Sequence, residues 1–214
     1  MKPDAIIRGL LQLSTCDVSD ALDRLKIRGA PLGILPLWEG CGRIAGPALT
    51  MKLVPGTSPS PVEGTLETIA AAQPGDILAI DHGGRLDANS WGGISAYCAR
   101  RRDIAGVVID GVSRDIEEMK AIGFPAYARG IIQQSVRGRC AFAGRGIEIR
   151  LAGIAVHPGD YLLADDNGLV VVPRQQVSEA LRIAKECSEA ERRVREEIDA
   201  GADPIEAHRR ARYE

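Results

Sequence analysis

The sequence predicts an α/β fold in one domain, with parallel strands joined by helices. Strand-like apolar runs alternate with helix-like segments between residues 74 and 123, the order that parallel strands with helical crossovers require. The run at 106–110 is rich in β-branched residues, as in strands buried on both faces of a sheet. The 214 residues can enclose a sizeable core, and no linker-like stretch divides them, so 1–214 are expected to form a single domain.

The N-terminal part is expected to be helical. Residues 4–25 repeat apolar side chains at helical spacing. Ser14, Thr15 or Asp17 can cap a second helix that begins near Val18. The acids in this stretch argue against a signal peptide.

Strands and helices then alternate along the chain. A strand is expected at 48–54 and a short helix at 65–72. The segment 74–84, PGDILAIDHGG, predicts a turn followed by a strand that ends in glycines. A helix is expected within 91–106, and it leads into the buried strand at 106–110.

The next helix is expected at 113–123, with Ser113 as its N-cap and Gly123 just past its end. Beyond it the chain becomes β-rich, and the expected strands are 125–128, 147–151, 161–164 and 169–172. A last helix, 175–200, has a narrow apolar stripe and a strongly charged second half. This pattern suits packing on a neighbouring subunit as well as a solvated surface.

Composition narrows the possible functions. A formal net charge of −2 and 4% aromatic residues give no general attraction to nucleic acid and few stacking platforms, so no direct nucleic-acid binding is expected. No apolar run approaches the roughly 20 residues of a membrane span. Five scattered cysteines without a CxxC pair favour reduced thiols in a cytoplasmic protein over a disulfide framework.

The stretch IDGVSRDIEE, residues 109–118, concentrates charge at the end of the buried strand. Acids in the first turn of a helix are what the helix dipole favours, so an ordinary helix start is one interpretation. Arg114 is unfavourable there, and Asp115 and Glu118 share a helix face, as two oxygen ligands of a hard cation would. The residues alone leave a structural helix start and a metal site both open.

A second candidate segment is HGGRLDANSWGGISA, residues 82–96, in which a strand, glycines and a helix start near Gly93 follow one another. It is neither a Walker A loop nor a GxGxxG fingerprint. Glycine-rich loops are often only turns, but adjacent parallel strands would bring this loop and the Arg114 segment to one crevice. The three histidines form no zinc-binding pattern.

The two segments, with their spacing, resemble the RraA-like family. This family includes metal-dependent 4-hydroxy-4-methyl-2-oxoglutarate aldolases, oxaloacetate decarboxylases and regulators of ribonuclease E activity. The resemblance is most specific around Arg114 and Asp115, and the matching stretches are 14–25, 42–50, 74–84, 91–96, 104–130 and 158–173. It implies an α/β sandwich of the swivelling-domain type, assembled as a homotrimer or hexamer with active sites between subunits.

The resemblance also implies roles for single residues. The aspartate of the Arg-Asp pair, here Asp115, would bind Mg²⁺ or Mn²⁺, and Arg114 would contact the keto oxygen of pyruvate. A glutamate from a neighbouring subunit's C-terminal helix would complete the site, and Glu191, with Glu189 as the alternative, matches it. The loop whose backbone N–H groups would hold the substrate carboxylate corresponds to Gly92, Gly93, Ile94 and Ser95.

One position departs from the aldolases, which usually carry an aspartate where this chain has Gly93. Glu118 is expected to supply the missing carboxylate as a second metal ligand. Aldol cleavage needs a base to take the substrate hydroxyl proton, whereas decarboxylation does not. The expected function is therefore a metal-dependent lyase that releases pyruvate from a small 2-oxo acid, and the alternative is a non-catalytic, protein-binding regulator of a ribonuclease.

Overall fold

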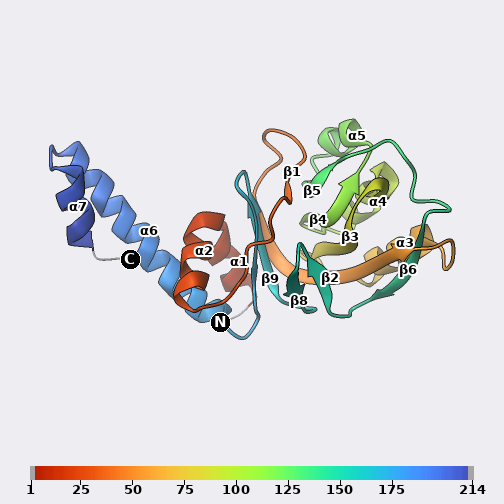
Figure 1. The fold of residues 1–214 in the computed structure, drawn as a ribbon, viewed down its shortest axis with the longest axis horizontal. Helices are drawn as coiled ribbons and strands as arrows, with labels where there is room; N and C mark the ends of the chain where they lie inside the picture. Colours follow the sequence, from red (N-terminus) through yellow and green to blue (C-terminus); the bar gives the residue numbers. More distant parts are fainter. Residues whose placement is uncertain (1–2, 212–214) are drawn as a thin grey trace.

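The structure, a computed structural model, describes residues 3–211 and shows a mixed α/β domain built on a large sheet (Figure 1). Along the sheet the strand order is β1-β5-β4-β3-β2-β9-β10, and β6 pairs with β2. The strands are β1 (Leu35–Pro36), β2 (Ile44–Pro55), β3 (Ile77–Trp91), β4 (Gly106–Ser113), β5 (Ala126–Ile131), β6 (Cys140–Arg145), β7 (Ile149–Leu151), β8 (Ile154–Val156), β9 (Tyr161–Asp165) and β10 (Gly168–Val172). The helices are α1 (Pro3–Leu11), α2 (Thr15–Arg24), α3 (Pro61–Ala71), α4 (Gly93–Arg100), α5 (Ile116–Ala121), α6 (Val177–Asp199) and α7 (Pro204–Ala211).

The centre of the sheet is parallel, as the sequence predicts. Strand β3 pairs in parallel with β2 on one side and β4 on the other, and β4 pairs in parallel with β5. Helices α3, α4 and α5 are the three crossovers. Every residue of β4 is buried, which explains its β-branched composition.

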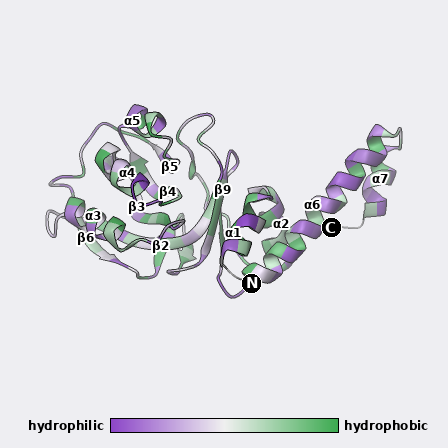
Figure 2. Ribbon diagram, turned by 180° about the vertical axis from the view of Figure 1, so that it is seen from behind, coloured by the Kyte–Doolittle hydropathy of each residue, from purple (hydrophilic) through white to green (hydrophobic). Residues whose placement is uncertain are grey.

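The other end of the molecule is helical. Strands β9 and β10 continue the sheet in antiparallel pairing, and α1, α2 and the first half of α6 pack against them in an apolar cluster (Figure 1). The rest of α6 extends away from the sheet, and α7 folds back on it. This distal part is largely hydrophilic (Figure 2). None of the helices within residues 3–211 has the length and apolar character needed to cross a membrane.

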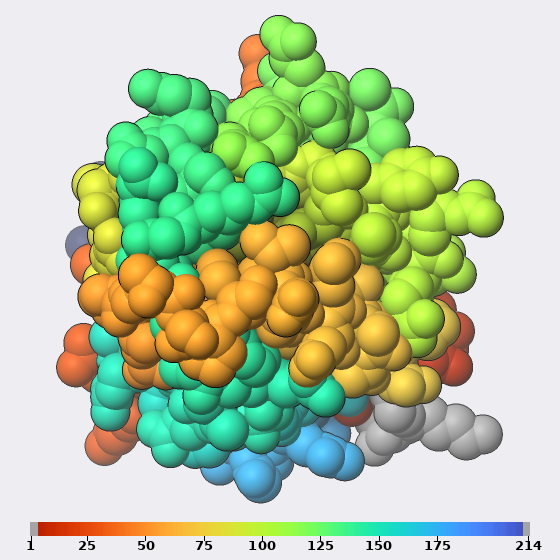
Figure 3. Space-filling model, turned by 90° about the vertical axis from the view of Figure 1, so that its right-hand side faces the viewer, coloured from red at the N-terminus to blue at the C-terminus, as the bar shows by residue number. Residues whose placement is uncertain are grey.

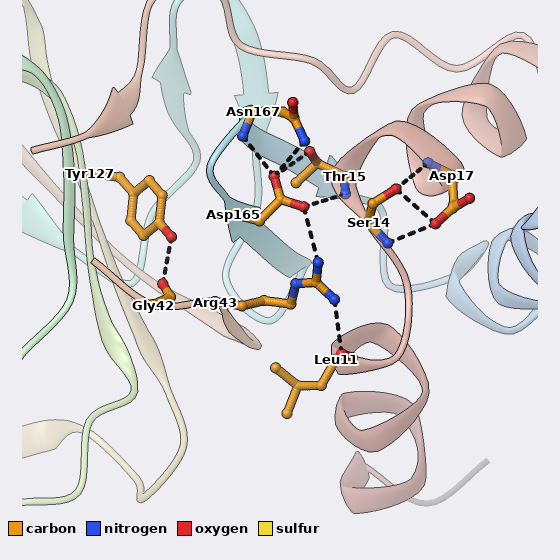
Figure 4. A network of polar contacts seen from close by, with 9 residues as sticks. All are labelled: Leu11, Ser14, Thr15, Asp17, Gly42, Arg43, Tyr127, Asp165 and Asn167. Carbon is orange, nitrogen blue, oxygen red and sulfur yellow. Dashed lines mark hydrogen bonds and ion pairs between the residues drawn. The ribbon is translucent and has the colours of Figure 1, made fainter. Parts of the chain in front are cut away.

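A buried carboxylate joins the helical end to the sheet. Asp165, at the end of β9, accepts hydrogen bonds from the Thr15 amide at 2.9 Å and the Thr15 hydroxyl at 2.7 Å (Figure 4). Arg43 lies 3.7 Å from the same carboxylate and also donates to the Leu11 carbonyl. Burial raises the pKa of Asp165, but the hydrogen bonds from Thr15 and the Asn167 amide, together with the charge of Arg43, bring the pKa below its ordinary value.

The predicted helix at 113–123 is wrong at its start. β4 runs through Ser113, which pairs with Trp91, and the Ser113 hydroxyl donates to the Trp91 carbonyl at 3.1 Å instead of capping a helix. Helix α5 begins only at Ile116. Gly123 does lie just past the helix end with a positive φ of 60°, as predicted.

Other boundaries also shift. The N-terminal segment is two helices, and Ser14 caps the second, which begins at Thr15 rather than near Val18. The helix predicted within 91–106 begins at Gly93 but ends at Arg100. Four elements were not predicted from the sequence, namely β1, β6, β8 and α7. β6 is short, contains Gly144 and is followed by Gly146, and α7 spans only eight residues, so each offers little local signal.

Candidate active site

The two candidate segments meet at one edge of the sheet. Trp91 ends β3 and Ser113 ends β4, and the two residues are register partners. Helix α4 starts just after Trp91, while Arg114 and Asp115 follow Ser113. The prediction that adjacent strand ends bring these loops together is confirmed.

Asp115 is the N-cap residue of α5 and adopts a left-handed backbone conformation, with φ 59° and ψ 42°. Aspartate tolerates this conformation better than most residues. Its Oδ2 accepts a hydrogen bond from the Gly93 amide at 2.9 Å and lies 3.4 Å from Arg114 Nε. This conformation turns the carboxylate toward the loop at Gly93.

Two glycines make room for these side chains. A Cβ at Gly92 would lie 2.6 Å from Asp115 Oδ2, and a Cβ at Gly93 would lie 1.8 Å from Glu118 Oε2. The Glu118 carboxylate therefore occupies the space that a side chain at position 93 would need. Asp115 Cβ is 3.4 Å from the same point, so both acids converge on Gly93.

Arg114 borders a cavity of about 120 Å³, which also touches Gly92, Ile94 and Ser95. Figure 3 looks onto this face, where α3, α4 and the segment 132–140 come together. The Arg114 side chain is about one-third exposed, and its buried Nε makes an ion pair with Asp115 but no hydrogen bond with the described residues. The guanidinium is thus held beside the cavity with donor capacity to spare.

The predicted backbone anion site is only partly free. The Gly93 amide is already engaged by Asp115, so it does not present an open N–H group. Ile94 and Ser95 follow in the first turn of α4, where backbone N–H groups have no partner within the helix. The anion-binding role expected of this loop therefore rests on Ile94 and Ser95.

Glu191 and Glu189 lie on α6, at the opposite end of the long axis from α4 and α5 (Figure 1). Glu191 pairs with Arg195 at 3.2 Å, and Glu189 pairs with Arg192 at 2.5 Å. Neither glutamate reaches the cavity of its own chain. A role for either in catalysis requires a second copy of the chain.

Asp115 and Glu118 offer oxygen ligands of the kind that hard divalent cations prefer. No cluster of three or more histidine, cysteine, aspartate or glutamate side chains suited to a metal occurs within residues 3–211. Mg²⁺ is commonly held by one or two carboxylates, with water and substrate completing its shell. The donor set therefore fits Mg²⁺ or Mn²⁺ better than zinc.

One part of the cavity lining was not predicted from the sequence. This part comes from the start of α3 and from the segment around Arg137. Asn89, on β3, accepts a hydrogen bond from the Val136 amide at 2.7 Å and so draws this segment over the strand end. Nothing in the local pattern at 132–140 signals such an approach, because the contact joins distant parts of the chain.

The histidines and cysteines do not join the site. His82 is buried with its Nε2 3.1 Å from the Ala88 carbonyl, and His157 lies between Glu148 and Asp160. All five cysteines are free thiols.

Known proteins resemble the chain over most of its length. Protein DlpA of Legionella pneumophila is 29% identical over 213 residues, 98% of this chain, but this chain spans only 34% of DlpA. A Thermus thermophilus protein named 4-hydroxy-4-methyl-2-oxoglutarate aldolase is 31% identical, with 76% of this chain and 94% of that protein aligned.

Among solved structures, Streptomyces coelicolor RraAS2, described as an unusual member of the RNase ES inhibitor RraA protein family, superposes with a TM-score of 0.83. It is 26% identical, and the match covers 90% of this chain and 98% of RraAS2. The RraA-like family, described as Aldolase/RraA, matches residues 15–171. Fold, strand-end geometry and sequence agree, and the chain belongs to the RraA-like family.

Proposed function

We propose that this chain is a divalent-metal-dependent carbon–carbon lyase that releases pyruvate from a 2-oxo acid. The observation that carries the proposal is the convergence of the Asp115 and Glu118 carboxylates on Gly93, beside Arg114 at the edge of a cavity. The named aldolase among its relatives supports the same reaction class.

Asp115 and Glu118 would hold Mg²⁺ or Mn²⁺. When bound, the cation supplies positive charge where the keto oxygen of the substrate becomes negative. Asp115 is oriented for this role by the Gly93 amide, and Glu118 by the space that glycine leaves open.

The protein groups orient the pyruvyl end of the substrate. The Arg114 guanidinium donates to the keto oxygen and stabilises the charge that develops there as the carbon–carbon bond breaks. The free N–H groups of Ile94 and Ser95, at the positive end of α4, hold the substrate carboxylate. These contacts fix the bond that breaks relative to the guanidinium.

The same arrangement favours decarboxylation over aldol cleavage. Retro-aldol cleavage needs a base for the hydroxyl proton, and Gly93 provides none. Glu118 lies in the space next to Gly93, and Glu191 from a neighbouring copy in a homotrimer or hexamer is the other candidate base. Loss of a β-carboxylate needs no such base.

The test follows pyruvate release from oxaloacetate and from 4-hydroxy-4-methyl-2-oxoglutarate, with Mg²⁺ or Mn²⁺ and again after EDTA. Protein-free reactions with the same metal give the spontaneous background. We expect metal-dependent release above background, with the larger acceleration for oxaloacetate. The absence of metal-dependent release from both substrates would refute the proposal.

The second candidate is a protein-binding regulator of a ribonuclease, residing in the cytoplasm. It is favoured by the likeness to RraAS2 and by the hydrophilic distal part of α6 with α7, which extends from the body as a surface for a partner. Co-purification with a ribonuclease, unchanged when Asp115 is replaced by Asn, would support this function. A metal affinity that depends on Asp115 would count against a vestigial site.

A further inference from the structure

The cavity extends well beyond the part that Arg114 and α4 border. Thr65 of α3 and Ser135 and Arg137 form another part of its lining, and Trp91 also lines it. A cavity of about 150 Å³ accepts a benzene ring, so a volume of about 120 Å³ takes a slightly smaller group. A carboxylate on one or two carbons has this size.

The charged side chains that line the cavity are positive. Arg114 and Arg137 both line the cavity, and no aspartate or glutamate does so among the described residues. Asp115 and Glu118 are not among the residues that line it. A small cavity with two guanidinium groups and no acid attracts an anion.

The donors that remain available are few. The hydroxyls of Thr65 and Ser90 already donate to backbone carbonyls. The indole N–H of Trp91, a residue only 1% exposed, has no acceptor within residues 3–211. A buried donor without a partner is costly, and a ligand that accepts from it removes that cost.

The Arg137 side chain is also available to bind a ligand. Its guanidinium makes no hydrogen bond or ion pair with the part of the chain that the structure describes, whereas nearby Arg139 donates to two backbone carbonyls. The Arg137 backbone is fixed, because its amide donates to the Ser135 hydroxyl at 3.2 Å. The free cation is therefore attached to an ordered segment of the cavity wall.

We propose that the part of this cavity beside Trp91 and Arg137 is the subsite for the second carboxylate of a dicarboxylic 2-oxo acid, the one farther from the keto group, and that Arg137 is its specificity-determining residue. The inference rests on the proposed function, which places the first carboxylate at Ile94 and Ser95 and the keto oxygen at Arg114. Arg137 and the Trp91 indole then receive the second carboxylate. A monocarboxylic substrate leaves both without a partner.

Calorimetry tests the subsite without requiring turnover. The full chain is titrated with 2-oxoglutarate, which has two carboxylates, and with 2-oxobutanoate, which has one, each with and without Mn²⁺. The variant is Arg137→Gln, and the control is Arg100→Gln, which removes the same charge from an exposed position outside the cavity. Neither arginine side chain has a partner to lose within residues 3–211.

We expect the wild type to bind 2-oxoglutarate more tightly than 2-oxobutanoate. Arg137→Gln should weaken 2-oxoglutarate binding by about tenfold to 100-fold and change 2-oxobutanoate binding by less than about twofold. Arg100→Gln should alter neither. Equal weakening of both ligands, no weakening, or the same effect from Arg100→Gln overturns the proposal.

The subsite and the proposed function can fail separately. If the wild type releases no pyruvate but keeps an Arg137-dependent preference for 2-oxoglutarate, the subsite stands and the lyase activity does not. If pyruvate is released with metal and the preference is absent, the lyase stands and the subsite is refuted.

Discussion

Two aspartates that follow one another closely in the chain show how differently an acid can be used. Asp110, inside β4, is buried and has both oxygens occupied, with Oδ1 2.5 Å from Arg129 Nε and Oδ2 accepting from the Ala152 amide at 2.8 Å. Asp115, beyond the strand end, is one-third exposed, and its Oδ1 makes no hydrogen bond within residues 3–211. Both oxygens of the first acid are engaged by the protein, whereas the second acid keeps one oxygen without a partner among the described residues.

The neighbouring acids repeat this contrast. Asp81, at the equivalent place in β3, accepts from the Gly83 amide at 3.0 Å and pairs with Lys52 at 3.0 Å. Glu118 is exposed, and its carboxylate has no partner among the described residues. Asp81 and Asp110, the buried pair, hold neighbouring backbone and basic side chains in place. Asp115 and Glu118, the rim pair, keep oxygens available for a ligand. A difference in unused hydrogen-bonding capacity, rather than charge, separates structural acids from candidate ligands.

The largest effect should come from Asp115→Asn. Asparagine also tolerates the left-handed backbone and keeps an acceptor for the Gly93 amide, but it removes the charge. Outer partners of a metal contribute about 10- to 100-fold to activity, so removal of Asp115, the proposed direct ligand, should lower the proposed metal-dependent pyruvate release by at least about 100-fold. Urea unfolding should show a stability change below about 1 kcal/mol. A large loss of stability would mean that Asp115 is a structural acid.

Asp110→Asn makes the same chemical change at a buried acid inside β4. It leaves the Arg129 guanidinium, whose side chain is 27% exposed, without its counter-ion. Loss of one member of a buried pair costs about 3–5 kcal/mol, and partial exposure of Arg129 lowers the expectation to about 2–3 kcal/mol. Chemical denaturation measures this loss, and the metal affinity of the folded fraction should stay unchanged. An unaltered midpoint of unfolding would contradict the comparison.

Gly93→Ala tests the space that the rim acids share. The new methyl group would overlap the Glu118 carboxylate, which is exposed and can move away, so the fold should be retained. We expect Mn²⁺ affinity to fall by about tenfold in a calorimetric titration. In a double-mutant cycle with Glu118→Gln the two losses should not add, because both changes act on the same proposed ligand. Additive losses would show that Glu118 does not depend on the open space at Gly93.

The smallest expected effect is on the pH dependence of stability, and it comes from the buried His82. Burial, reinforced by Arg85, holds the pKa of His82 below its ordinary value. The unfolded chain then binds the proton more readily, so stability is full above a pH of about 6.5 and falls as the pH drops below it, by at most about 1.4 kcal/mol per pH unit. His82→Gln should flatten this dependence in unfolding curves measured between about pH 5 and 7. Metal binding above pH 7 should be the same in both proteins.

Local sequence determined much of the framework. The β-branched run made the buried strand that ends at Ser113, and the spacing from the WGG segment to Arg114 and Asp115 was enough to bring both to one sheet edge. These features follow from interactions within a few residues and from the regular pairing of parallel strands. The local pattern also predicted Ser113 as a helix cap. That prediction was wrong because the Ser113 hydroxyl donates to the Trp91 carbonyl, a contact with another strand that the local pattern does not contain.

Which acids keep an unpaired oxygen, and which side chains face Arg114, depends on tertiary packing. Asp110 and Asp115 have the same chemistry in sequence, and they differ because Arg129 and Ala152 reach one and not the other. The wall with Arg137 exists because the Val136 amide finds Asn89 across the fold. Such contacts join segments far apart in the chain, so their presence depends on how the sheet and loops pack rather than on any local pattern.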